Sequence, residues 1–139
     1  MVFDESQSIF VTDAMYVFQA KAGLCPWAFM AVMQSRLFLF LYRLSNQGES
    51  RVIPQIKASQ LDTIPFPMLK SELPKVKELS SICKTLLTAK QQLSASHSDR
   101  DKDFYGNKCS ALDTQIDALV YELYGLTEDE IKIVEGRSV

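Results

Sequence analysis

The sequence predicts an α+β chain, in which a small antiparallel sheet with an enclosed helix is followed by a long helical hairpin and a short C-terminal helix. Two early runs, SIFVT and AMYVFQA, are rich in β-branched and aromatic residues and are separated by Asp13, which favours an antiparallel pair. Two later segments repeat apolar residues at three- and four-residue steps, the spacing of one helix face. With 139 residues, we expect one compact unit made of an α+β part over 1–70 and a helical part over 71–139.

The first helix is expected over residues 27–44. Pro26 suits the first helical turn, and the segment is apolar nearly all round, which predicts a mostly enclosed helix. It is also the best membrane candidate of the sequence. However, Gln34-Ser35-Arg36 interrupts its apolar runs, and an arginine at the centre of a bilayer is costly. A buried core helix is therefore the preferred interpretation.

The segment RVIPQIKASQLDTIPFPMLK, residues 51–70, differs from an ordinary helix or strand. Pro54 and Pro65 force extended geometry on the residues before them, and KASQLD between them can form one or two helical turns. The pattern predicts a strand, a turn of helix and a second strand.

The C-terminal half predicts a helical hairpin. Ser71 can cap a helix over 71–95, a polar loop with the lone His97 follows, and a second helix is expected over 108–124. Their apolar stripes would bury one another. Gly125 suits the position just past the second helix. In the last helix, Thr127 and Glu130 have the spacing of a capping box.

Charge is distributed unevenly, although the formal net charge is only −2. Residues 51–94 carry an excess of four positive charges, and residues 109–139 carry an excess of five negative charges. A mildly basic face and an acidic face are therefore expected, and a nucleic-acid partner is supported on local grounds only.

Residues for catalysis or metal binding are scarce. The three cysteines are far apart and form no CxxC pair, which indicates a reduced, cytoplasmic chain and argues against a zinc site. The five glycines form no phosphate-binding loop, and a single histidine makes nucleophilic catalysis improbable. The acids of TEDEIK are accounted for by helix capping. We therefore expect no enzymatic activity from this chain by itself, and no cofactor on it.

Three motifs resemble one family. IPQIKASQLDTIPFP (53–67, the proline motif) resembles the fPQIK-x-x-QL-x-x-lPiP phrase of the TaqI-like C-terminal specificity domain. That domain is the target-recognition part of adenine-specific DNA methyltransferases and single-chain restriction-modification enzymes. FVTDAMYVFQAK followed by AFMAVMQSRLFLFLYR (28–43, the serine motif) is similar to its strand pair and LNSkL helix, and IDALVYELYGLTEDEIKIVE (116–135, the closing motif) is similar to its end. The three motifs keep the family's order and spacing.

The chain also departs from the family. Gln34 stands where the family has asparagine, which puts any backbone bond of that asparagine in doubt. The sequence contains no glycine loop for S-adenosylmethionine, no Asn-Pro-Pro-Tyr motif and no nuclease constellation. The resemblance therefore covers the last part of such an enzyme. A fragment, a gene remnant and a separate specificity polypeptide all fit.

The resemblance implies double-stranded DNA and a methyltransferase catalytic domain or subunit as partners, with S-adenosylmethionine as the cofactor of the parent enzyme. The turns around 51–61 would form the reading surface. Lysine or arginine can contact phosphate or guanine, glutamine pairs with adenine, and serine serves either role. The candidate DNA-binding residues are Arg51, Gln55, Lys57, Ser59 and Gln60.

Structural roles compete with these assignments. The two glutamines can cap backbone groups of the turn, and the two cations can be solvated surface charges. Arg36 and Arg43 are expected to pair with acids rather than to bind DNA, and Tyr121 and Tyr124 are expected in the core. The rival function is a helical interaction module, with a possible homodimer through helices 71–95 and 108–124.

Overall fold

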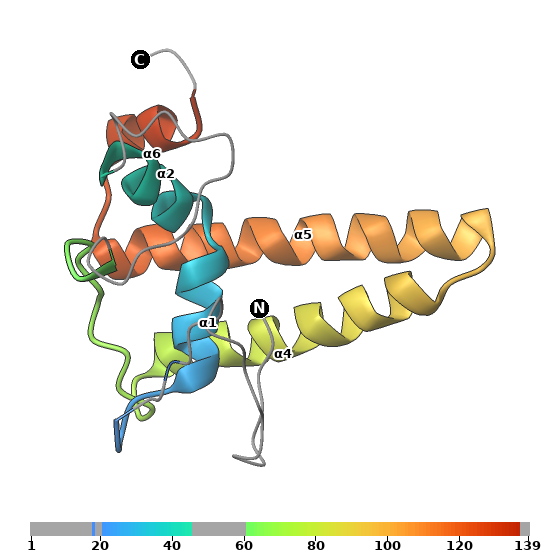
Figure 1. Ribbon diagram of the computed structural model, residues 1–139, viewed down its shortest axis with the longest axis horizontal. Helices are drawn as coiled ribbons and strands as arrows, with labels where there is room; N and C mark the ends of the chain where they lie inside the picture. Colours follow the sequence, from blue (N-terminus) through green and yellow to red (C-terminus); the bar gives the residue numbers. More distant parts are fainter. Residues whose placement is uncertain (1–17, 19–20, 46–60, 137–139) are drawn as a thin grey trace, which may run out of the picture.

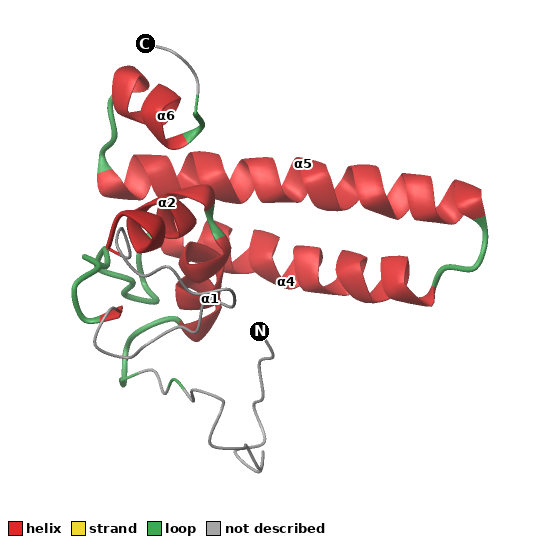
Figure 2. Cartoon of the chain, turned by 45° about the horizontal axis from the view of Figure 1, so that its top comes forward, coloured by secondary structure: helices red, strands yellow, loops and turns green. Residues whose placement is uncertain are grey.

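The computed structural model describes residues 18, 21–45 and 61–136. This part of the chain contains five helices, which are α1 (Pro26–Gln34), α2 (Arg36–Ser45), α4 (Pro74–Ala95), α5 (Asp99–Tyr124) and α6 (Glu128–Val134). The long helices α4 and α5 run antiparallel, α1 crosses them near one end, and α2 and α6 lie beside each other over the C-terminal part of α5 (Figure 1). The far end of the hairpin projects away from α1, α2 and α6 (Figure 2).

The predicted α+β class is wrong for the described residues, which are mostly helical and contain no strand. Their only β pairing is an isolated antiparallel bridge between Leu24 and Lys70. The second strand expected at the end of 51–70 is instead irregular backbone. A proline at position 65 and another at 67 remove the N–H groups that a ladder needs. The predicted early pair, SIFVT and AMYVFQA, lies outside the described residues except for Phe18.

The predicted helical hairpin is confirmed, and its two stripes form the core. Val76, Leu79 and Leu86 of α4 and Val120 of α5 are at most 1% exposed. Each such side chain contributes roughly 1.5–3 kcal/mol on burial, so the pairing of stripes outweighs intrinsic helix preferences. The core continues under α1 through three small or β-branched residues, Ala28, Ala31 and Val32.

The single helix expected over 27–44 is two helices, and the break falls at Ser35. The backbone of Ser35 is extended, with ψ 156°, and its hydroxyl donates to the carbonyl of Val32 at 2.7 Å. The same oxygen accepts from the Phe38 N–H at 3.2 Å, so Ser35 caps the next helix while closing the first. The chain can therefore turn α2 toward α5.

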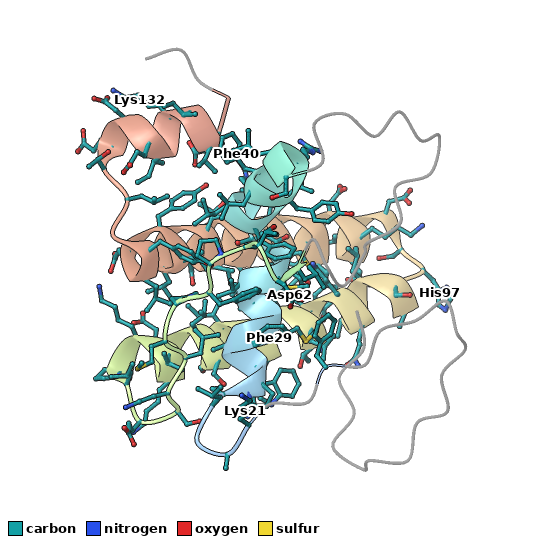
Figure 3. The ribbon with its side chains drawn as sticks, turned by 60° about the vertical axis from the view of Figure 1, so that its left-hand side comes forward. Lys21, Phe29, Phe40, Asp62, His97 and Lys132 are labelled. Atoms are coloured by element: carbon teal, nitrogen blue, oxygen red, sulfur yellow. The ribbon has the colours of Figure 1, made fainter. Side chains whose placement is uncertain are left out.

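Helix α5 begins nine residues before the predicted start at 108. Ser98 caps it, because its hydroxyl accepts from the Asp101 N–H at 3.1 Å, and acidic residues fill the first turn. The polar segment after residue 95 was predicted as a loop because it lacks apolar periodicity. His97 lies at the hairpin end and points away from the molecule (Figure 3).

The remaining helix ends agree with prediction, with one correction. Gly125 has φ 67° and ends α5, and Thr127 and Glu130 form both bonds of the capping box of α6. Helix α4, however, begins at Pro74 rather than at Ser71, whose N–H instead bonds the carbonyl of Gly23 at 3.0 Å. No helix within the described ranges is both long enough and apolar enough to span a bilayer.

Candidate functional site

The five predicted DNA-binding residues, Arg51, Gln55, Lys57, Ser59 and Gln60, lie outside the described residues. The structure describes the second half of their segment, residues 61–70, and shows what holds it. This half is the candidate support of the reading surface, and we call it the ledge. Most of the ledge is exposed, and Ile64, 4% exposed, and Leu69, 5% exposed, are its buried points.

An aromatic cluster fixes the ledge against α1 and α2. The ring of Phe66 stacks on Phe29 of α1, with centroids 5.1 Å apart, and lies 5.9 Å from the ring of Phe38 of α2. The ring of Phe18 also contacts Phe29, with centroids 5.4 Å apart. Offset or tilted aromatic pairs of this kind contribute about 0.5–1.5 kcal/mol beyond the area that they bury. The proline motif is therefore attached to the serine motif through Phe66.

Tyr124, in the last turn of α5, also binds the ledge. Its hydroxyl donates to the carbonyl of Pro65 at 2.7 Å. Burial of the phenol raises the pKa of Tyr124 to about 12, because the charged phenolate would lose its hydration. The neutral hydroxyl thus remains a donor throughout the physiological range. The expected core position of Tyr124 is confirmed only in part, because its side chain is half-buried while Tyr121 is 5% exposed.

Asp117 joins the serine motif to the closing motif. Its Oδ1 accepts from the backbone N–H of Arg36 at 2.8 Å, and its Oδ2 lies 3.1 Å from Nε of the same residue. The carboxylate is therefore a second cap on α2, supplied by α5, alongside Ser35. The prediction that Arg36 pairs with an acid is confirmed.

The two partners of this ion pair differ in exposure. The side chain of Asp117 is 10% exposed, whereas that of Arg36 is 60% exposed. Burial raises the pKa of Asp117 above its ordinary value, and the N–H and guanidinium of Arg36 partly offset that rise, while Asp113 and Glu135 add to it. Asp117 is thus a buried acceptor whose charge is only partly compensated.

Two shallow hollows of about 500 and 330 Å³ flank the Arg36–Asp117 pair. Their linings mix acids and bases, with Glu128 and Lys132 in the larger and Lys90 and Asp113 in the smaller. Among the described residues, no group of three or more His, Cys, Asp or Glu could hold a metal ion. The thiol of Cys83 is buried, and that burial raises its pKa to about 11, so it is a poor nucleophile.

Asp117 and Ser35 had no predicted role in the site. Both had a recognisable signal. Asp117 lies directly beside Ile116 in an apolar helical stripe, and an acid at such a position needs a partner when buried. Ser35 stands before Arg36 in the middle of an apolar run, where serine favours a cap over a helix interior. Their partners, however, are far away in the sequence.

The geometry brings all three family-like motifs together. Phe66 of the proline motif contacts Phe29 and Phe38 of the serine motif, Tyr124 of the closing motif bonds the proline motif, and Asp117 of the closing motif bonds the serine motif. Gln34, at the position of departure from the family, makes a weak bond from its Nε2 to the carbonyl of Met30 at 3.4 Å.

The chain matches no protein-family model, no curated protein sequence and no solved structure.

Proposed function

We propose that this chain is the DNA target-recognition portion of a restriction-modification adenine methyltransferase. The observation that carries the proposal is the convergence of the three motifs described above. The three motifs contact one another through a hydroxyl, a carboxylate and an aromatic cluster. This convergence is expected if the motifs build one recognition unit, and it supports the proposal.

The physical task of such a portion suits a braced surface. Methylation of an adenine requires that the base leave the stack, which is the task of a catalytic domain. A second module must hold the duplex and read base edges. A surface that is already fixed before binding avoids the cost of ordering loops on the DNA. The ledge, which follows the proposed reading residues in the sequence, supports this proposal, because Tyr124 and Phe66 fix it while Asp62, Thr63 and Lys70 remain exposed.

Each of the five candidate DNA-binding residues has a proposed role. Arg51 and Lys57 contact phosphate or guanine, Gln55 and Gln60 pair with adenine, and Ser59 serves either role. The partners are double-stranded DNA and a catalytic domain or subunit, which binds S-adenosylmethionine in the cytoplasm. This chain contributes binding and no chemical step.

A selection experiment tests this proposal. The full chain is incubated with a library of randomised duplexes at about 50 mM salt, because phosphate contacts weaken steeply with salt, and the bound duplexes are sequenced. We expect one enriched sequence motif. Binding to that motif should weaken by roughly 1–3 kcal/mol in Arg51→Ala and in Lys57→Ala.

A matched control keeps this experiment specific. Lys132→Ala removes one positive charge from α6, where Lys132 pairs with Asp129 at 2.8 Å. It should leave both the enriched motif and the affinity unchanged. If no motif is enriched, or if all three variants weaken binding equally, target recognition by these residues is refuted.

A helical interaction module is the second candidate. The observation in its favour is that Leu39 and Leu44 of α2 and Ile133 of α6 are 46%, 47% and 51% exposed. The apolar stripe of α4 is already covered by α5 within one chain, so a homodimer would use other faces of the predicted helices. A dimer mass in solution that persists at high salt, together with no DNA binding, would favour this candidate.

A further inference from the structure

Helix α4 carries a polar stripe that faces away from the core. Lys77, Lys84 and Gln91 are spaced by seven residues, and Ser81 and Thr88 lie between them. A seven-residue step is almost two full turns, so Lys77, Lys84 and Gln91 share one face and are spaced about 10.5 Å apart along the helix axis. All five are exposed. We call this set the lysine stripe.

The lysine stripe differs from the other basic residues of the same helix. Lys75 and Lys90 lean toward α5 and pair with acids there, at 2.8 Å to Glu122 and 3.7 Å to Asp113. Within the described residues, Lys77 has no acid at ion-pair distance. The residues one turn away from Lys77 are not acidic; they are Leu73, Pro74, Ser80 and Ser81.

Lys84 contacts an aromatic ring rather than an acid. Its Nζ lies 5.2 Å from the centre of the ring of Trp27, which belongs to α1. A cation–π contact attracts the ammonium group to the ring face but supplies no counter-charge. The one acid of α4, Glu78, lies about 100° around the helix from Lys77, on a different side.

The basic character continues beyond the N-terminal end of α4. Lys70 and Lys21 belong to two segments that backbone bonds join, from the Cys25 N–H to the carbonyl of Leu69 at 2.9 Å and through the Leu24–Lys70 bridge. Figure 3 shows Lys21 beside the start of α1, at the same end of the molecule. Both lysines are exposed, and Glu72 follows Lys70 two positions later in the sequence.

We propose that the lysine stripe contacts the sugar-phosphate backbone of duplex DNA. This inference rests on the proposed function and adds a positioning surface to its reading surface. Lysine, serine, threonine and glutamine are side chains that proteins use for phosphate and sugar contacts. Lys77 and Lys84, about 10.5 Å apart along one exposed helix face, are close enough to contact phosphates of the same duplex. The acidic α5–α6 side would turn away from the duplex.

The test compares two double variants of the full chain. Lys77→Gln/Lys84→Gln removes two charges from the stripe, and Lys75→Gln/Lys90→Gln removes two charges from the paired face of the same helix. Binding to a fluorescein-labelled mixed-sequence duplex is followed by anisotropy over a range of salt concentrations. Each phosphate contact contributes about 0.9 to the slope of log K against log salt, so the stripe variant should lower the slope by about 1.8. The control variant should leave the slope unchanged.

A third variant separates charge from folding. Lys77→Arg/Lys84→Arg keeps both positive charges and should restore the wild-type slope. Circular dichroism and urea unfolding of each variant show that the fold is retained. If both glutamine variants lower the slope equally, or if neither does, the lysine stripe is not a DNA contact. A wild-type chain that binds no duplex at about 50 mM salt also overturns it.

Failure of this inference is distinguishable from failure of the proposed function. If a sequence motif is enriched but the slope of the stripe variant is unchanged, target recognition is supported and the lysine stripe is refuted as a DNA contact. A lowered slope with no enriched motif leaves a backbone-binding surface and refutes target recognition.

Discussion

Replacing Asp117 is the sharpest test of how the motifs are held together. In Asp117→Ala, the bond from the Arg36 N–H at 2.8 Å and the contact with the guanidinium at 3.1 Å are both lost. A hydrogen bond involving a charged group contributes about 1.5–3 kcal/mol, and a buried donor left unpaired costs about 1–3 kcal/mol. Part of this loss is offset, because the buried charge of Asp117 is itself unfavourable. We expect a net loss of about 1.5–3 kcal/mol in the free energy of unfolding.

Asp117→Asn separates the acceptor from the charge. The asparagine carbonyl still accepts from the Arg36 N–H, and the cost of burying a charge disappears, so the loss should stay below about 1 kcal/mol. Urea unfolding followed by the fluorescence of Trp27, the single tryptophan of the chain, measures both variants. Asp113→Asn is the matched control, because its ion pair with Lys90 is long, at 3.7 Å, and half exposed. It should change stability by less than about 1 kcal/mol.

The pH dependence gives an independent check. The pKa of Asp117 is higher in the folded chain than in the unfolded chain, so the folded chain binds its proton more tightly. The resulting contribution to stability is complete below the unfolded pKa, about 3.9, and is lost as pH rises through the raised folded value. The advantage of wild type over Asp117→Asn should therefore shrink from acidic to neutral pH. An advantage that grows with pH, or an alanine variant as stable as wild type, would refute this account of the capping carboxylate.

Two further predictions concern the ledge and the last helix. Tyr124→Phe removes the donor to the carbonyl of Pro65 and should cost about 0.5–1.5 kcal/mol in urea unfolding at neutral pH. Because the folded pKa of Tyr124 is about 12 against an ordinary 10.0, wild-type stability should fall as pH rises from 10.0 toward 12. That alkaline loss should be absent from the phenylalanine variant, and equal curves would contradict the buried hydroxyl. Thr127→Ala removes the capping box with Glu130 and should cost about 1 kcal/mol of helix stability. The loss should be seen as faster amide exchange within α6, and unchanged exchange would show that tertiary contacts alone hold the helix.

The elements that the sequence predicted well are those whose signals are local. Gly125 ends α5 because a left-handed residue is needed there, and Thr127 with Glu130 starts α6 through bonds that span three residues. The facing stripes of α4 and α5 follow from helical spacing together with the need to bury apolar surface. These decisions involve neighbours within one or two turns, so they can be read without knowing the rest of the fold.

Other features depended on contacts between distant residues. In the sequence, residues 27–44 look like one helix, but the helix breaks at Ser35. Asp117, which lies 82 positions after Ser35, caps the second helix by accepting from the Arg36 N–H. The prolines at 65 and 67 disfavour a strand there, and Tyr124 and the ring of Phe29, which are distant in the sequence, hold the segment in its position. Propensity could not decide these points, because the competing local conformations differ by less than one buried hydrogen bond is worth.

Spacing along the chain was enough to predict the two long helices, the end of α5 at Gly125 and the start of α6 at Thr127. Tertiary structure decided where the early helix divides, how residues 61–70 are held, and which lysines of α4 are neutralised by acids of α5. The physical reason is that caps and stripes depend on spacing along one helix. The partner of a buried carboxylate or of an exposed lysine depends on which other helix lies beside it.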